Sequence, residues 1–381
     1  MHSKNVFRAR TNSADPEEAI SFLAEELRSK QAKMSVLFIS NSYNLKKIEP
    51  YINKYMGDNV VACSTAGEIN SEEGYSENSI SGISFSGDAF EASVLDIPVL
   101  DDFTQDLAKD LREQTMLSIG KHKESLKKGR SFAFLLVDGL TMKEEATTGA
   151  LSYVIPGDVP LVGGSAGDGL NFQATHIYYD GQFEVNRAVV VLMTTSLPFE
   201  VFQAQHFSES DRKMVITEAD PKSRIVKEID GEPAAEAYAR FLGVPIEEFG
   251  PHIYSKHPVM LNIGGTNYVR SIQKVNEDKS LTFYCAIEEG IVLTLANKDP
   301  IVDNVEELFS GIKGKIGKLD SCILFECILR RLEVLDLQEE DRSRIINCYK
   351  KNNAVGFHTY GEQVGGVHVN QTITGIAFGH E

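Results

Sequence analysis

Short apolar runs alternate along the first part of the chain with stretches whose apolar residues recur every three or four positions. The runs at 34–41 (MSVLFISN) and 131–139 (SFAFLLVDG) have the length and composition of buried β-strands. The stretch 104–121 has its apolar residues on one side, which predicts an amphipathic helix. From 175 to 206 several predicted strands follow one another. Helices alternating with strands, followed by a series of strands, predict an α+β fold of mixed β-sheets flanked by helices.

A change to polar composition between residues 208 and 223 (SESDRKMVITEADPKS) marks the predicted junction between two domains. A chain of 381 residues is long enough for two domains that each bury a core. We therefore predict one domain over residues 1–207 and a second over 224–381. In the second domain the apolar run 321–331 (SCILFECILRR) is predicted as a strand, and a β-hairpin closes the chain.

The predicted terminal hairpin covers residues 354–379, where alternating apolar positions lead into a Gly-rich reversal at Val364-Gly365-Gly366. Polar side chains are dense in this apolar frame. Within fifteen positions the hairpin carries His358, Tyr360, Glu362, His368, Asn370, Gln371 and Thr372. Because buried donors and acceptors need partners, this density predicts a site that binds or coordinates something polar.

The two faces of the last strand decide which of these side chains can meet. Side chains of a strand point alternately to its two faces, so His368 and Asn370 share a face. Whether His358 and Tyr360 lie on that face depends on the register, because a shift of one residue exchanges the faces. A histidine that ligates a metal through one ring nitrogen usually has a hydrogen-bond partner on the other. We predict Asn370 or Tyr360 as this partner of His368.

Charge and composition exclude several classes of function. A formal net charge of −17 repels nucleic acid, and the one basic cluster, residues 121–130, falls at the predicted end of a helix. The longest apolar runs, such as 188–193, are too short to cross a bilayer, and no leader peptide is predicted. Five cysteines without a disulfide spacing indicate a reducing compartment, so we expect a cytoplasmic protein without membrane or nucleic-acid partners.

Sequence motifs for catalysis lack their context. Residues 163–167 (GGSAG) formally match the G-x-S-x-G turn of serine hydrolases, but that turn must lead into a helix. The next residues, 168–179, predict a turn and a strand instead. Cys63 has no adjacent base, and Cys322 and Cys327 have no zinc-site spacing. We therefore predict that the protein is not an enzyme.

Four segments resemble the FIST sensory module: VACSTAGEI (61–69), LVGGSAGDG (161–169), GFHTYGEQ (356–363) and HVNQT (368–372). The resemblance extends over most of the chain and implies the two FIST modules, N-terminal and C-terminal. The histidine before VNQT is similar to that of the nitric-oxide-sensing haem proteins within this family, a narrower resemblance that rests on few residues.

This narrower resemblance implies that the protein binds haem b and senses nitric oxide or another diatomic gas. His368 is the predicted iron ligand and His358 the second choice. The other residues predicted to contact the cofactor are Tyr360, Glu362, Asn370 and Arg270. The chain has no kinase, cyclase or DNA-binding motif, so the resemblance implies a separate signalling partner, such as a histidine kinase or a cyclic-di-GMP enzyme. The sequence leaves a homo-oligomer open.

Two alternatives to haem binding stay open at this point. In one, a haem-free FIST module senses a small metabolite such as an amino acid through Arg270, Glu362 and Asn370. In the other, His368 is a core histidine that holds the hairpin together by hydrogen bonds. With or without haem, Arg270 and Arg330, which lie in or beside apolar segments, are expected to pair with a buried carboxylate or a ligand acid. For haem that acid would be a propionate.

Overall fold

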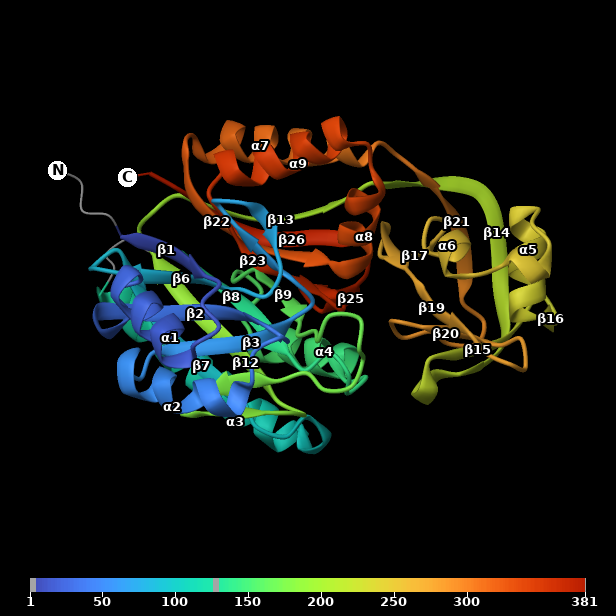
Figure 1. The fold of residues 1–381 in the computed structure, drawn as a ribbon. Coiled ribbons are helices and arrows are strands. Elements are labelled where there is room, and N and C mark those ends of the chain that lie inside the picture. Colours follow the sequence, from blue (N-terminus) through green and yellow to red (C-terminus); the bar gives the residue numbers. More distant parts are fainter. Residues whose placement is uncertain (1–4, 126–129, 381) are drawn as a thin grey trace.

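The computed structural model describes residues 5–125 and 130–380, and Figure 1 shows how their sheets are arranged. Three six-stranded sheets, with helices outside them, form what we call the main body, the described residues before 207 and after 298. A fourth sheet with helices α5 and α6 forms the outlying lobe, residues 207–298, seen at the right. The predicted α+β fold of mixed sheets flanked by helices is confirmed.

Each sheet of the main body contains one parallel pair of strands, β2–β3, β8–β9 or β22–β23, in an otherwise antiparallel order. The first sheet has the order β1 (Val6–Thr11), β6 (Ile80–Ser86), β2 (Ala32–Ser40), β3 (Val60–Thr65), β10 (Ile177–Tyr179) and β11 (Gln182–Glu184). The second has the order β25 (Val367–Val369), β24 (Glu362–Val364), β9 (Leu161–Ser165), β8 (Arg130–Val137), β12 (Ala188–Thr195) and β7 (Phe90–Ile97). The third has the order β13 (Phe199–Gln205), β26 (Thr372–Gly379), β22 (Leu319–Cys327), β23 (Ala354–Thr359), β4 (Glu68–Asn70) and β5 (Gly74–Ser76).

The three sheets share one central core, and helices cover their outer faces. Phe38, Phe134 and Phe357, one from each sheet, belong to this core. Leu37, the neighbour of Phe38, points to the opposite face and packs under α1 and α2. Because both faces are covered, these strands are apolar along most of their length, as the runs 34–41 and 131–139 predicted.

The helices are distributed by sheet. Those over the first sheet are α1 (Pro16–Glu26) and α2 (Leu45–Tyr55). Those over the second are α3 (Gln105–Ser125) and α4 (Glu144–Val154). Those over the third are α7 (Ile301–Ile316), α8 (Ile328–Asp336) and α9 (Glu339–Lys351), of which α7 and α9 lie at the top of Figure 1. Short 3-10 helices span Ser29–Gln31, Leu100–Asp102, Pro221–Ser223 and Ile246–Glu248. Of the predicted basic cluster, residues 126–129 lie outside the described residues.

The outlying lobe has its own sheet and its own apolar core. Its strand order is β18 (Thr266–Arg270), β17 (Val259–Ile263), β21 (Val292–Lys298), β14 (Phe207–Asp220), β15 (Ile225–Ile229), β20 (Leu281–Phe283) and β19 (Ile272–Val275), with β16 (Glu232–Pro233) beside β15. Helices α5 (Ala234–Leu242) and α6 (Pro251–Tyr254) complete it. The core joins residues of the sheet to α5 and is separate from the core of the main body.

The chain enters the lobe through β14 and leaves it through β21. These strands are antiparallel partners. At the end nearest the main body, the amide of Asp299 donates to the carbonyl of His206 over 2.9 Å. Residues 208–223, predicted as a junction, form most of β14 and the 3-10 helix after it. Beyond residue 298 the chain returns to the main body, so residues 224–381 are divided in space between the lobe and the main body.

The terminal hairpin is shorter than predicted. β24 and β25 pair across Gly365 and Gly366, with Gln363 opposite His368. The flanking strands β23 and β26 do not pair with each other, because β22 lies between them, parallel to one and antiparallel to the other. The predicted strand 321–331 also ends early, at Cys327, and α8 begins at Ile328. A short apolar run has no periodicity that separates a buried strand from a buried helix.

Candidate functional site

A cavity of about 40 Å³ lies where the main body meets the outlying lobe. The main body contributes the loop after β8, the start of α4, the loop after β9 and the connection between β23 and β24. The lobe contributes residues from the start of β15 and from β19 and β20. The lining residues are Gly139, Leu140, Met142, Glu144, Phe172, Arg224, Gln273, Phe283, Tyr284 and Tyr360. The site is therefore built from segments that are far apart in the sequence.

Three residues that line the cavity have left-handed backbone conformations. Met142, Phe172 and Arg224 have φ angles of 57°, 51° and 53°. This region costs a non-glycine residue about 1–3 kcal/mol, and such residues gather at ligand sites and switch regions. Met142 and Phe172 also expose 47% and 37% of their surface, although both are large and apolar. Strain and exposed apolar surface thus coincide at this cavity.

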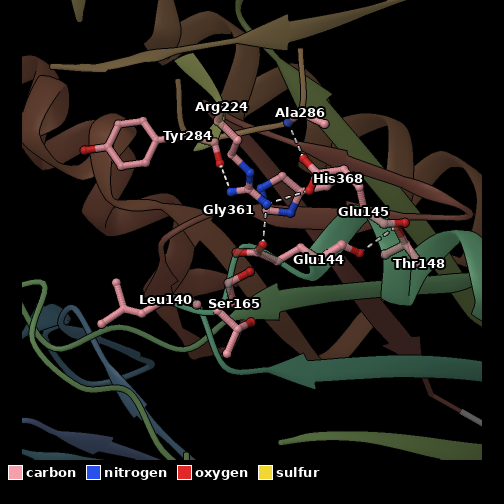
Figure 2. A network of polar contacts seen from close by, with 12 residues as sticks. Leu140, Glu144, Glu145, Thr148, Ser165, Arg224, Tyr284, Ala286, Gly361 and His368 are labelled. Atoms are coloured by element: carbon pink, nitrogen blue, oxygen red, sulfur yellow. Dashed lines mark hydrogen bonds and ion pairs between the residues drawn. The ribbon is translucent and has the colours of Figure 1, made fainter. Parts of the chain in front are cut away.

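Arg224 joins the lobe to the main body through a pair of carboxylates. Its Nη2 donates to Glu144 Oε2 and to Glu145 Oε2, each over 2.6 Å, and its Nη1 donates to the carbonyl of Tyr284. The other oxygen of Glu145 accepts from the amide of Ala286. Figure 2 shows this network, with the glutamates at the start of α4 and the arginine reaching them from the lobe. One guanidinium therefore has two carboxylates as neighbours.

The two glutamates differ in charge state. Burial raises the pKa of Glu144 to about 7, and the neighbouring Glu145 raises it too, against the attraction of Arg224. Burial also disfavours ionisation of Glu145, but the charge of Arg224 and the amide of Ala286 favour the carboxylate, and the pKa of Glu145 is lowered. Near neutral pH, Glu145 is therefore the firmly ionised partner of Arg224, whereas Glu144 is close to its titration point.

His368 lies beside this network, fully buried on the edge strand β25. Its Nδ1 accepts from the side-chain amide of Gln363 over 3.2 Å, and its Nε2 has no hydrogen-bond partner among the described residues. The predicted partners, Asn370 and Tyr360, are wrong because the register places Gln363 opposite His368. Burial lowers the pKa of His368 to about 4, against the attraction of Glu145. The imidazole is thus neutral at physiological pH.

His358 lies in other surroundings, on β23 of the third sheet. Its ring meets the ring of Tyr75 edge-on, with centroids 4.5 Å apart, and its Nδ1 is 3.6 Å from Glu326 Oε2. Burial, with Arg331 nearby, holds the pKa of His358 well below its usual value. The two histidines that compete as iron ligands thus have different neighbours, and the hairpin register does not bring them to a common partner.

The other predicted site residues separate into two groups. Tyr360 lines the cavity, where its ring stacks on Phe172 at 4.7 Å and its hydroxyl donates to Asp168. Arg270 and Asn370 lie at the contact between lobe and main body, where Arg270 donates to the carbonyl of His368 and Asn370 accepts from the amide of Ser271. Glu362 lies apart from the cavity lining, bonded to the hydroxyls of two threonines, Thr359 and Thr372, and burial raises its pKa to about 8.

The residues around His368 do not fit haem in this arrangement. The ring is 1% exposed, and a Cβ at Gly361 would lie 2.4 Å from its Cε1, so the imidazole packs directly on the main chain. The junction cavity holds about 40 Å³ and His368 does not line it, whereas cavities for drug-sized ligands hold about 300–1,000 Å³. An open groove of about 690 Å³ beside β1 and α1 is lined by residues 10–25, which include no histidine.

Sequence reasoning missed the charged part of the site. Glu144 and Glu145 stand at the start of a helix, where acidic residues are favoured by the helix dipole and signal no site. Arg224 stands about 80 positions further along the chain, and its ion pairs form only when the lobe meets α4. The match of GGSAG to a hydrolase turn has no helix behind it, because β9 ends at Ser165 and a loop leads to β10, as predicted.

The fold and the site define a two-part α+β protein with a polar junction where its parts meet. Residues 33–232 match the FIST N domain and residues 234–365 match the FIST C domain. Because the first match alone spans more than half of the chain, the chain belongs to the FIST family. No curated protein matches it.

FIST domains are sensory modules rather than catalytic ones, and they assign this chain a role in sensory signalling. The narrower resemblance to nitric-oxide-sensing haem proteins stays a prediction. None of the helices in the described ranges combines the length and the apolar character needed to span a bilayer.

Proposed function

We propose that this FIST protein is a haem-free sensory module that binds a small polar metabolite, such as an amino acid, where the main body meets the outlying lobe. The observation that carries the proposal is the state of Arg270, which is 4% exposed. Its Nη1 donates to the main-chain carbonyls of Val269 and His368, and its Nε has no partner among the described residues. Among the described residues Arg270 has no carboxylate partner, whereas Arg224 has two.

A buried guanidinium without a counter-ion is costly, because the cation loses its hydration without a compensating charge. The acidic group of a ligand would supply that charge, and the planar fork of arginine matches a carboxylate. Other unpaired polar groups lie next to Arg270 in sequence or across the junction, namely the hydroxyl of Ser271 and Nε2 of His368. These groups support a ligand that combines an acid with further polar atoms.

The size of the cavity indicates that a ligand enters only after a rearrangement. About 40 Å³ corresponds to little more than one water molecule. The lobe is attached to the main body by the two chain crossings at β14 and β21 and by polar contacts at the junction. One of these contacts joins the amide of Ser271 to Asn370 Oδ1 over 3.4 Å. We propose that the ligand alters how the lobe meets the main body, and that a separate signalling partner, such as a histidine kinase or a cyclic-di-GMP enzyme, responds to that change.

A screen of the twenty common amino acids and simple organic acids by thermal shift, followed by titration calorimetry, tests this proposal. We expect at least one compound to bind the wild-type protein and to lose its binding in Arg270→Gln. The matched control is Arg240→Gln, because Arg240 lies on the same lobe with its side chain 59% exposed and paired with Glu232. Binding that is unchanged in Arg270→Gln, or a screen without any bound compound, would contradict the proposal.

Haem binding is the second candidate, and the unpaired, buried Nε2 of His368 favours it. Both ring nitrogens of His358 are likewise unpaired among the described residues, so this observation does not separate the two histidines. Because the residues around His368 do not fit haem in this arrangement, this candidate requires the junction to open. Its test is the absorption spectrum of protein reconstituted with haem. A Soret band that is lost in His368→Ala and retained in His358→Ala would support this candidate and replace the first. The absence of a band in the wild-type protein would leave the haem-free proposal.

A further inference from the structure

The second glutamate on Arg224 has no evident structural task. Glu145 uses both carboxylate oxygens, one on Arg224 and one on the amide of Ala286, and thereby ties α4 to the lobe. Glu144 bonds to the same Nη2 of Arg224 that already serves Glu145. Because Glu145 neutralises the guanidinium, the charge of Glu144 is a surplus negative charge in a buried place, where Glu144 is only 2% exposed.

The position of the two glutamates relative to the cavity separates them further. Glu144 and Arg224 both line the cavity, whereas Glu145 does not. The carboxylate of Glu144 thus stands on the cavity side of Arg224, together with the rings of Tyr284, Phe172 and Tyr360. An acidic group that entered this cavity would therefore compete with Glu144 for Arg224.

We propose that the carboxylate of Glu144 is a built-in substitute for a carboxylate of the ligand, and that the ligand displaces it from Arg224. This inference rests on the proposed function and adds a second recognition residue, Arg224, and the chemical class of the group that it binds. Displacement exchanges an ion pair between main body and lobe for an ion pair between ligand and lobe. Glu145 keeps its contacts, so the lobe stays attached while its contact with the start of α4 loosens.

The protonation state of Glu144 makes this exchange feasible near neutral pH. With a pKa of about 7, Glu144 takes up a proton readily when a second anion approaches Arg224. Binding of a carboxylate should therefore weaken as the pH rises through 7. The charged or titratable groups around Glu144 and the cavity are Arg224, Glu145, His368, Arg270, Asp168, Cys285, Tyr284 and Tyr360. Burial raises the pKa of Cys285 to about 11, so this thiol stays neutral between pH 6 and 8. Burial raises the pKa of both tyrosines and lowers that of His368 to about 4, so these three groups do not titrate between pH 6 and 8.

Acetate is the probe, and acetamide is its uncharged counterpart of nearly the same shape. Titration calorimetry or ligand-observed NMR at constant ionic strength would measure the binding of both to the wild-type protein, Glu144→Gln and Glu145→Gln. At pH 8 Glu144, with a pKa of about 7, is mostly ionised, and removing its competing charge should tighten acetate binding in Glu144→Gln by about tenfold. At pH 7 the gain should be only about twofold, because half of the wild-type protein already carries a protonated Glu144. Acetamide should bind all three proteins alike. Glu145→Gln should show no gain for acetate. Loss of the Glu145 charge lowers the pKa of Glu144, which then stays ionised on Nη2 of Arg224 and competes with acetate.

A second measurement keeps the inference testable if a variant loses stability. In the wild-type protein the affinity for acetate should fall between pH 6 and pH 8, and in Glu144→Gln it should stay level over this range. Equal acetate affinity in the wild type and Glu144→Gln, or the absence of acetate binding in Glu144→Gln, would overturn the inference. The proposed function is judged separately by the metabolite screen with Arg270→Gln, so it can hold while this inference fails.

Discussion

His358 and His368 are ten residues apart and both fully buried in the main body, yet they lie on different sheets and only His368 is at the junction with the lobe. His358 lies inside the main body, between Tyr75 and Glu326, which belong to the same body. His368 lies on an edge strand at the junction, where Arg270 of the lobe donates to its carbonyl over 3.0 Å. Burial alone therefore does not mark a functional histidine, whereas a position between two separately built parts makes His368 sensitive to how they meet.

The charges around the two histidines differ in the same way. Near His358, Glu326 has Arg330 within 3.6 Å and accepts hydrogen bonds from Tyr75 and Tyr349, so the buried charges are matched inside the main body. Near His368, the hydrogen-bond acceptors of Arg270 in the described ranges are main-chain carbonyls, and Arg224 has two carboxylates for one guanidinium. The first cluster is self-contained in charge, although Nε and Nη2 of Arg330 and both ring nitrogens of His358 lack hydrogen-bond partners among the described residues. The second cluster is unbalanced in charge, which a ligand could correct.

The largest expected effect comes from removing the arginine of the self-contained cluster. Arg330→Met should lower the free energy of unfolding by about 3–5 kcal/mol, because it leaves the buried Glu326 without its cation. Arg270→Met should lower it by only about 1 kcal/mol, the worth of its hydrogen bonds, since no carboxylate is abandoned. Urea denaturation of the two variants measures both values. Equal losses in the two variants would show that Arg270 has a counter-ion in the folded protein. The contrast between the two clusters would then be wrong.

A smaller effect is expected from adding a methyl group beside His368. In Gly361→Ala the new Cβ would lie 2.4 Å from the imidazole Cε1, and the buried ring cannot move away freely. We expect a loss of about 1–3 kcal/mol in the free energy of unfolding, the usual cost of overpacking. Gly149→Ala is the control, because that glycine lies in α4 with open space at its Cβ, and it should stabilise by up to about 1 kcal/mol. Gly361→Ala with wild-type stability would show that the ring is mobile at the junction.

The smallest effect is expected from the titration of His368. Its pKa falls from 6.5 in the unfolded chain to about 4 in the folded protein, so below pH 6.5 the unfolded chain binds the proton and the folded protein does not. Stability is therefore lost as the pH falls from 6.5 towards 4. Relative to His368→Gln, the wild type should lose about 1 kcal/mol between pH 7 and pH 5.5. Parallel stability curves for the two proteins in urea would contradict a neutral, buried His368.

The sequence by itself determined the class of fold and most of the buried strands. The runs 34–41 and 131–139 became β2 and β8 because a strand that is covered on both faces must be apolar along its length. The density of polar residues near the end of the chain likewise indicated a polar site, and Tyr360 does line the cavity. Local composition carries this kind of information because the hydrophobic effect acts on each segment separately.

Only the tertiary structure decided which residues form the site. The predicted hairpin spans residues 354–379, but β22 separates β23 from β26. The hairpin register therefore applies only to Glu362–Val369. Glu144 meets Arg224 because the lobe folds back on the start of α4, and an ion pair between distant residues leaves no periodic trace in the sequence. Ion pairs between residues far apart in the sequence depend on how the lobe and the main body pack together. The pattern of apolar residues does not specify that packing.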